Sequence, residues 1–200
     1  MDAKLKYPVI TIGREYCAYG RSVAAKLEEQ LGIKYYDKDF VNKIIIESGF
    51  PEETVEKENE RMSGGAKFWE DLLSATATYS SSYDRIFEAQ KQVVIDLAKE
   101  PCILVGRAAG NILREAGINS FNIYLYADIE TRVKRCAELN PELKPSQMEK
   151  YVRKIDSDRQ TYYKRYTGTD LDDPHNYNIC LDVGTLGLDQ TVETILALVR

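Results

Sequence analysis

Residues 9–22 read VITIGREYCAYGRS, and residues 23–32 continue as VAAKLEEQLG. The first part is an apolar run rich in β-branched residues, and a loop follows it. A helix with one apolar face begins near Gly20, because apolar residues recur at helical spacing from Val23 to Leu31. Strand, loop and helix in this order are typical of a P-loop, which binds the phosphates of a nucleotide.

The loop departs from the P-loop consensus G-x-x-x-x-G-K-[ST], since an arginine, Arg21, precedes the hydroxyl of Ser22. Backbone N–H groups at a helix start attract phosphate, and Gly20 would allow the chain to approach it closely. Arg21 could neutralise phosphate charge as a lysine would, and the hydroxyl of Ser22 could hold Mg²⁺. The alternative is a plain strand-to-helix turn that binds no anion.

Composition and charge narrow the class of protein. A chain of 200 residues suffices for one substantial core, and a net charge of −5 argues against a generic nucleic-acid binder. No N-terminal stretch resembles a signal peptide, and no apolar run reaches the roughly 20 residues that span a bilayer, so we expect a cytoplasmic protein with no membrane partner. Four scattered cysteines and one histidine argue against a zinc site. Cys17 lies in the loop and could be reactive, although nothing pairs it with a base.

Apolar runs predict five buried strands, at residues 8–13, 33–37, 101–106, 121–126 and 177–182. Most runs are near-continuous rather than alternating, which is typical of a parallel sheet covered on both faces. Helical patterns separate or follow these strands, at residues 20–31, 128–139 and 188–199. Strands that alternate with helices predict a doubly wound α/β fold.

Two longer regions interrupt this alternation. Residues 38–100 read as a helical insert, with a break at 61–65 and a polar stretch at 76–82 that would suit a mobile loop. Residues 144–175 contain a strongly charged helix at 146–166, followed by a loop. Inserts of this kind at the carboxyl ends of strands could close over a ligand. The sequence thus predicts a single domain over the whole chain, with two inserts.

Charged residues follow the second and third predicted strands, where they would face the ligand crevice of such a fold. Asp37 follows the second strand and could contact a ligand. Its alternative role is the N-cap of the next helix, although Asp39 suits that position better. Arg107 follows the third strand and could bind phosphate bidentately, or it could be a solvated residue of a first helical turn.

The charged helix carries Arg153, Asp156 and Arg159 at steps of three residues, which would place all three close to one face. A functional interpretation makes the helix a lid whose arginines stabilise a phosphoryl group in flight. The alternative is a solvated helix with ion pairs along its own surface. Arg132 and Arg135, just after the fourth strand, could serve the same cleft or only its rim.

Taken together, these stretches resemble the cytidylate kinase-like proteins, within the nucleoside monophosphate kinase group of P-loop enzymes. The resemblance covers nearly the whole chain and depends on the order and spacing of several short motifs. These are ITIGREY with Gly20 and Arg21, YYDKD at 35–39, residues 87–90, ILVGRAA at 103–109, YADIETRVKR at 126–135, Asp156 with Arg159, YYKRYTG at 162–168 and NYNICLD at 176–182.

The resemblance implies a three-layer P-loop kinase fold. It would contain a five-stranded parallel sheet, a helical monophosphate-binding insert at about 38–100 and a lid at about 144–175. It also implies ATP and Mg²⁺ as cofactors. The implied ATP-binding residues are Gly13, Gly20, Arg21, Ser22 and Arg132, with Ser22 also on the metal. The implied acceptor-binding residues are Asp37, Gln90 and Arg107, and the implied catalytic residues are Arg21, Arg153 and Arg159.

Ala108 stands where cytidylate kinases have an aspartate that helps to bind the acceptor, so the sequence leaves the acceptor open. The first hypothesis is ATP-dependent phosphoryl transfer to a nucleoside monophosphate such as CMP or dCMP, or to a similar small acceptor. A second is a non-catalytic nucleotide-binding or sensing protein, because Cys17 and Tyr19 stand where the family often has glycine. A third is a kinase for a metabolite that is not a nucleotide. The oligomeric state is also left open.

Overall fold

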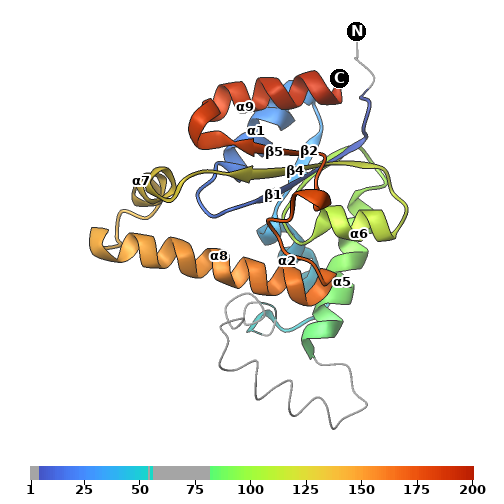
Figure 1. Ribbon diagram of the computed structural model, residues 1–200. Coiled ribbons are helices and arrows are strands. Elements are labelled where there is room, and N and C mark those ends of the chain that lie inside the picture. The colour runs from blue at the N-terminus through green and yellow to red at the C-terminus, as the bar shows by residue number, and fades with distance from the viewer. Residues whose placement is uncertain (1–4, 54, 56–81) are drawn as a thin grey trace.

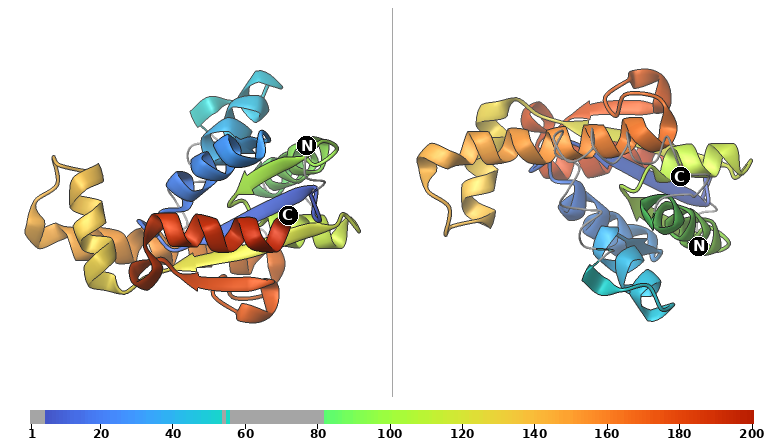
Figure 2. Two further views of the ribbon diagram at one scale, coloured as in Figure 1. Left: turned by 90° about the horizontal axis from the view of Figure 1, so that it is seen from above. Right: turned by 90° about the horizontal axis from the view of Figure 1, so that it is seen from below.

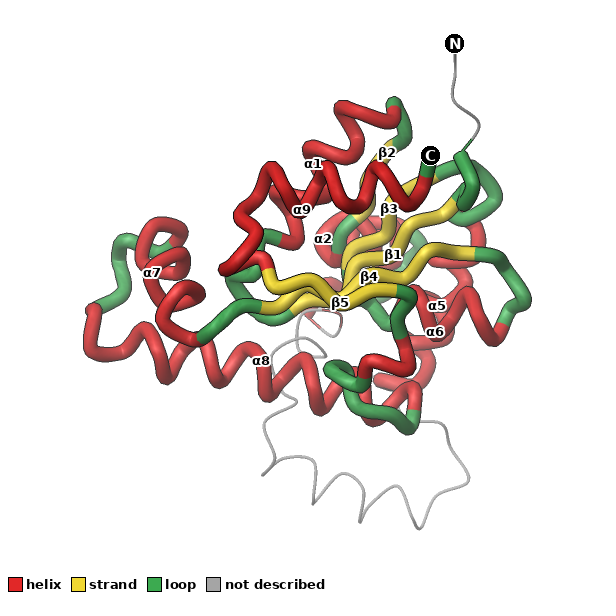
Figure 3. The backbone as a smooth tube through the Cα atoms, turned by 45° about the horizontal axis from the view of Figure 1, so that its top comes forward, coloured by secondary structure: helices red, strands yellow, loops and turns green. Residues whose placement is uncertain are grey.

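The computed structural model describes residues 5–53, 55 and 82–200 (Figure 1). Its centre is a five-stranded sheet whose neighbouring strands are all parallel, in the order β2-β3-β1-β4-β5 (Figure 3). The strands are β1 (Val9–Arg14), β2 (Lys34–Tyr36), β3 (Cys102–Val105), β4 (Ser120–Tyr126) and β5 (Ile179–Asp182). Each overlaps one of the five predicted apolar runs, so the predicted parallel sheet is confirmed.

Both faces of the sheet are covered, which explains the near-continuous apolar runs. Alternate residues of a strand face opposite sides, so Ile10 and Ile12 of β1 lie in one core while Val9 lies in another. Figure 2 shows α9 in front of the sheet from one side and α8 in front of it from the other.

The first face packs against α1 (Gly20–Leu31) and α9 (Val183–Val199), which also contact each other. Buried side chains of both helices, such as Leu27 and Ile195, join those of the strands in the larger core. α9 is interrupted at Gly187, whose φ of 71° and ψ of 170° are not helical. This interruption explains why the helical periodicity of the sequence is recognisable only from residue 188.

The opposite face packs against α5 (Ser82–Leu97) and α6 (Ala109–Glu115), whose apolar residues form a second core with β1 and β3. α2 (Lys38–Glu47) packs on α5 around a smaller cluster that includes Val41 and Ile86. These two helices are the described parts of the predicted insert. The predicted break at 61–65 lies outside the described residues, as does the polar stretch predicted at 76–82 except for Ser82, which begins α5.

The chain leaves two adjacent strands toward opposite faces: α1 follows β1 on one face, and α6 follows β3 on the other. Such a divergence opens a crevice at the carboxyl ends of the two strands. α7 (Ile129–Leu139) and the long α8 (Pro145–Thr167) pack together beyond it, and a short turn, η1 (Pro174–Asn176), leads into β5. Within the described ranges, none of the helices combines the length and apolar character that crossing a membrane requires.

Candidate functional site

A cavity of about 190 Å³ lies at the carboxyl ends of β1 and β3, where the two chain paths diverge. Its walls come from the end of β1, the turn after β3, the second half of α8 and the segment 171–177. The first residue of α2, Lys38, closes one side. The cavity therefore occupies the place at which open α/β sheets bind their ligands.

An unusual turn after β3 forms part of the cavity wall. Gly106, Arg107 and Ala108 have φ angles of 85°, 55° and 53°, all in the left-handed region. Residues other than glycine seldom adopt this conformation, and strain of this kind is most often stored at functional sites. The turn brings Arg107 to the cavity, as the sequence predicts for a residue that follows the third strand.

Arg107 is held by the insert helices. Its Nη2 donates to Oδ1 of Asn42 at 3.1 Å, and its Nη1 donates to Oε1 of Gln90 at 3.5 Å. Gln90 is fully buried and also accepts a 2.6 Å hydrogen bond from the hydroxyl of Tyr162. Gln90 is absent from the cavity wall, so its observed contacts orient Arg107 and Tyr162.

Four cations surround the cavity: Arg14, Lys38, Arg107 and Arg159. Among the described residues, no carboxylate lies within 4.0 Å of the charged nitrogens of Arg14, Lys38 or Arg159. The cavity does contain one carboxylate, Asp158, but this group pairs with Nζ of Lys154 at 2.8 Å. The cavity thus concentrates positive charge.

This crowding shifts the protonation equilibria of the cations. Burial, followed by the charges of Arg159, Arg21 and Arg107, holds the pKa of Arg14 well below its ordinary value. Burial also lowers the pKa of Arg159. For Lys38, burial and then the charge of Arg107 lower the pKa. An anion in the cavity would relieve this repulsion, so the arrangement suits a phosphate or another compact anion.

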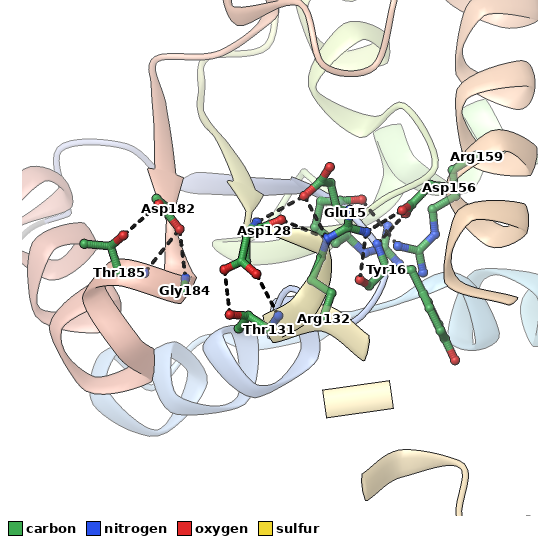
Figure 4. Close-up of polar contacts among 12 residues, drawn as sticks. Glu15, Tyr16, Asp128, Thr131, Arg132, Asp156, Arg159, Asp182, Gly184 and Thr185 are labelled. Atoms are coloured by element: carbon green, nitrogen blue, oxygen red, sulfur yellow. Dashed lines mark hydrogen bonds and ion pairs between the residues drawn. The ribbon is translucent and has the colours of Figure 1, made fainter. Parts of the chain in front are cut away.

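The first residues of the loop between β1 and α1 are bound to α7 and α8 by hydrogen bonds and ion pairs (Figure 4). The backbone N–H of Tyr16 donates to Oδ1 of Asp156 at 2.6 Å, and Asp156 also pairs with the buried guanidinium of Arg132. Arg132 lies 3.1 Å from Oε2 of Glu15 as well. A carboxylate from α8 therefore engages the backbone N–H of Tyr16, which is then not free to bind an anion.

The side chains of the loop also pack into the protein. Tyr16 and Cys17 contact the apolar cluster between α7 and α8, and Cys17 and Tyr19 have φ angles of 62° and 56°. Burial, together with the neighbouring Cys136, raises the pKa of the Cys17 thiol to about 12. The thiol of Cys17 is therefore neutral at ordinary pH, which argues against the reactivity that its loop position allowed.

Arg21, at the start of α1, does not line the cavity, although its charge acts on Arg14. Its side chain is 58% exposed, and it pairs with Asp37 at 2.7 Å and with Asp39. Asp37 is also the N-cap of α2, since it accepts hydrogen bonds from the backbone N–H groups of Asp39 and Phe40. The expectation that Asp39 is the better N-cap is wrong. Both partners of the Arg21–Asp37 pair are thus engaged with each other.

Ser22 has a cation beside its hydroxyl, because Nη2 of Arg135 lies 3.5 Å from Oγ. A neighbouring guanidinium opposes a divalent cation. Among the described residues, no group of three or more histidine, cysteine, aspartate or glutamate side chains could hold a metal ion. Ser22 as a Mg²⁺ ligand stays a prediction, and a metal there would lie beside the guanidinium of Arg135.

Two further predicted site residues, Arg153 and Gly13, have contacts that a structural role explains. Arg153 is 62% exposed and pairs with Glu149 on the outer side of α8, so the expectation that it shares a face with Arg159 is wrong. Two residues six positions apart differ by about 120° around a helix, which places Arg153 outward and Arg159 inward. Gly13 makes room for Tyr177, whose hydroxyl would lie 2.7 Å from a Cβ at that position.

Sequence reasoning missed Arg14 and Lys38 as residues of the cavity. A signal for Arg14 was present, because Gly-Arg occurs at the ends of two strands, as Gly13-Arg14 and as Gly106-Arg107. The two strands are neighbours with Ile12 opposite Val105, so the pairs meet at one edge of the sheet. Lys38 carried no comparable signal, since a lysine at a helix start is usually solvated.

Comparisons with known proteins agree with this architecture. The chain matches the model of the cytidylate kinase-like family over residues 9–185. Among curated proteins, none matches it significantly. An uncharacterized protein from Eubacterium ventriosum ATCC 27560 has a similar structure, with a TM-score of 0.71 and 22% sequence identity over 95% of this chain and 96% of the other.

Two kinases have the same fold at lower similarity. A shikimate kinase from Bacteroides thetaiotaomicron aligns with a TM-score of 0.55 and 11% identity, over 95% of this chain and 97% of the other. A gluconokinase from Sinorhizobium meliloti 1021 aligns with a TM-score of 0.55 and 15% identity, over 94% and 89%. These alignments confirm the predicted three-layer kinase fold, and the family match shows that this chain belongs to the cytidylate kinase-like family.

Proposed function

We propose that this protein transfers the γ-phosphoryl group of ATP to a small anionic acceptor that binds in the cavity. The observation that carries the proposal is the group of four cations at the carboxyl ends of β1 and β3, three of which lack a carboxylate partner among the described residues. Membership of a kinase-like family and the kinase fold support phosphoryl transfer in general.

In the proposed reaction an acceptor oxygen attacks the γ-phosphorus of ATP. The new oxygen–phosphorus bond forms as the bond to the β–γ bridging oxygen breaks, and the electron pair leaves with ADP. Little covalent help from the protein is needed, because such transfer depends on positioning and on stabilisation of negative charge. Arg107, from the turn after β3, and Arg159, from α8, supply that charge to the cavity.

The preferred acceptor is a nucleoside monophosphate of the CMP or dCMP kind. A phosphate oxygen is already ionised at neutral pH and needs no general base, which suits a cavity with four cations and one paired carboxylate. The tyrosine side chains in the wall, among them Tyr162 and Tyr177, offer a planar, partly apolar surface to the rest of the acceptor.

Asp158 supports a second class of acceptor. Its carboxylate lines the cavity and could accept a proton from an attacking hydroxyl, as an alcohol acceptor requires. The two classes are separable by one substitution. Asp158→Asn should abolish transfer to a hydroxyl acceptor, by about 100-fold or more, and should leave transfer to a phosphate acceptor within about threefold.

The predicted inserts are proposed to close over the acceptor. In the described residues, α2 contributes Lys38 and Asn42, and α5 contributes Gln90, all around Arg107. From the other side, α8 contributes Arg159 to the same cavity. We therefore assign residues of about 38–100 to acceptor binding and residues of about 144–175 to a lid, within a single domain.

A non-catalytic nucleotide-binding protein is the alternative, and one observation favours it. The backbone N–H of Tyr16 is engaged by Asp156, and Arg21 by Asp37 and Asp39, so the loop that would receive the donor phosphates has internal partners. In this alternative the protein binds ATP or CMP without turnover.

One assay separates the proposals. ADP release is measured with ATP and Mg²⁺ across nucleoside monophosphates and small hydroxylated acids, and nucleotide affinity is measured by calorimetry. Acceptor-dependent ADP release supports the kinase, and the class of acceptor shows which of its two forms holds. Affinity without ADP release supports the non-catalytic alternative, and the absence of both contradicts each of them.

A further inference from the structure

Two arginines stand at the ends of the loop between β1 and α1, and they have opposite surroundings. Arg21 is exposed and paired with two aspartates, whereas Arg14 lines the cavity. We propose that Arg14, and not Arg21, is the cation with which this loop binds the transferred phosphoryl group. The identity of that group rests on the proposed function, but the anion site does not.

Two glycines, Gly20 and Gly106, leave the space that the side chain of Arg14 occupies. A Cβ on Gly20 would lie 2.9 Å from Cγ of Arg14, and a Cβ on Gly106 would clash with its Nη1. The side chain therefore passes between the start of α1 and the turn after β3. A residue with a side chain at Gly106 would exclude the guanidinium from this place, so the glycines serve the position of Arg14.

The guanidinium of Arg14 is a charge without a counterion. Among the described residues, no hydrogen bond or ion pair joins its guanidinium to another group, and its carbonyl oxygen accepts a hydrogen bond from Arg159 at 3.3 Å. Cations surround it, including Arg107 and Arg159, while Asp37 is the carboxylate that favours its charged form. An uncompensated guanidinium among cations is unfavourable unless an anion completes the site.

The equivalent position on the neighbouring strand strengthens this inference. β1 and β3 are paired in parallel, β1 ends in Gly13-Arg14, and Gly106-Arg107 directly follows β3, so Arg14 and Arg107 both lie at the carboxyl edge of the sheet. Guanidinium groups bind phosphate oxygens through parallel N–H donors. Two of them, from neighbouring strands, would bind one phosphoryl group together. They would take the role that a single lysine has in a P-loop.

The test compares the two arginines as a matched pair, with inorganic pyrophosphate as the probe and calorimetry as the measurement. Arg14→Gln should weaken pyrophosphate binding by about tenfold or more, because it removes charge-assisted hydrogen bonds. Arg21→Gln should change the affinity by less than about twofold, because its charge is balanced by Asp37 and Asp39. Equal losses, the reverse order, or no binding by the wild-type protein at millimolar pyrophosphate would overturn the proposal.

Thermal unfolding without pyrophosphate separates binding from structure. Arg14→Gln relieves repulsion, so its midpoint should equal or exceed that of the wild type, whereas a structural role would lower it. Arg14→Lys should recover part of the lost affinity, and no recovery in a folded variant overturns the role of the charge. Should Arg14→Gln not fold, phenylglyoxal modification of the wild-type protein decides. Pyrophosphate should protect Arg14 and leave Arg21 as reactive as before, and the opposite pattern overturns the proposal.

Kinetics distinguish this inference from the proposed function. If the wild type binds pyrophosphate through Arg14 but transfers no phosphoryl group to any acceptor, the kinase proposal fails and the anion site stands. If Arg14→Gln turns over at the wild-type rate, the role of Arg14 fails and the kinase proposal stands.

Discussion

The loop after β1 and the cavity beside it both lie at the carboxyl edge of the sheet, but they differ in whether their charged groups have partners of opposite charge. In the loop, Asp156 meets the backbone N–H of Tyr16, and Arg132 joins Asp156 to Glu15. In the cavity, Arg14 and Arg159 have no carboxylate within ion-pairing distance among the described residues. The first region contains ion pairs, whereas the second contains cations that have no carboxylate partner among the described residues.

This difference shows that a sequence motif and a binding site need not coincide. The residues that resemble a phosphate loop, from Glu15 to Ser22, mainly hold α1, α2 and α8 together. The cations without a carboxylate partner among the described residues lie beside this loop, in the cavity wall, where we propose that an anion binds. Substitutions in the two regions should therefore have different consequences, the first for stability and the second for ligand affinity.

The largest effect is expected from Arg132→Gln. Arg132 is 6% exposed and connects the loop to α8 through Glu15 and Asp156, so its removal leaves two partly buried carboxylates without their cation. We expect a loss of about 3 kcal/mol in the free energy of unfolding, measured by denaturant titration. A loss below about 1 kcal/mol, as for a surface pair, would contradict the view that Arg132 holds the loop against α8.

Asp156→Ala should make the loop more like the cavity, because it removes a carboxylate that the loop now contacts. The substitution releases the N–H of Tyr16 and the guanidinium of Arg132, so the loop should gain the ability to bind an anion. Pyrophosphate titration should then show two sites per chain in place of one, with a stability loss of about 1–3 kcal/mol. A stoichiometry that stays at one in the folded variant would show that Asp156 does not exclude anions from the loop.

In the cavity, removal of Lys38 should increase stability and weaken ligand binding. The native pKa of Lys38 lies below its ordinary 10.5. Burial is the largest cause, the charge of Arg107 lowers the pKa further, and the charge of Asp39 raises it in part. A lowered native pKa means that stability is present above pH 10.5 and is lost as pH falls through the lowered value, so charged Lys38 is unfavourable at neutral pH. Lys38→Met should raise the neutral-pH melting temperature and weaken pyrophosphate binding about fivefold.

The pH profile checks the same residue independently. Pyrophosphate affinity of the wild type should fall as pH rises through the lowered pKa of Lys38, because the lysine loses its charge. Lys38→Arg should remove that alkaline fall, since arginine keeps its charge. A profile that is the same in Lys38→Arg and in the wild type would show that another group titrates.

The smallest effect is expected from Arg153→Gln. Its exposed pair with Glu149 spans one helical turn, so the free energy of unfolding should change by less than about 0.5 kcal/mol. ADP release by the variant should equal that of the wild type. A loss of turnover without a loss of stability would place Arg153 back among the catalytic residues, as the sequence pattern proposed.

Much of the fold could be predicted from the sequence, because strand runs and helix periodicities are local properties. The five apolar runs predicted the strands, and the helical pattern predicted at 128–139 corresponds to α7, whose N-cap Asp128 accepts from the N–H of Thr131. The helix that follows Asp182 was recognised late, since the interruption at Gly187 hides its beginning. Local signals of this kind need no knowledge of distant contacts.

The site was predicted less well, because its residues come from separate elements. The sequence directed attention to Arg107 and Arg159, which do line the cavity, and also to Arg21 and Arg153, which do not. All four are arginines in segments that the sequence predicts to surround a ligand. Arg21 and Arg153 pair with carboxylates that α2 and α8 provide, whereas the turn after β3 and the packing of α8 bring Arg107 and Arg159 to the cavity.

By itself, the sequence determined the parallel sheet, the order of strands and helices, and the placing of arginines at strand ends. These follow from hydrophobic periodicity and from the chemistry of glycine and arginine along a short stretch of chain. Only the tertiary structure decided which cations have partners. Asp156 reaches the loop across 140 residues of chain, while Gly20 and Gly106 leave a passage through which Arg14 enters the cavity. Ion pairs between distant segments form only once the core has fixed their geometry, so the charge of the cavity is a property of the fold.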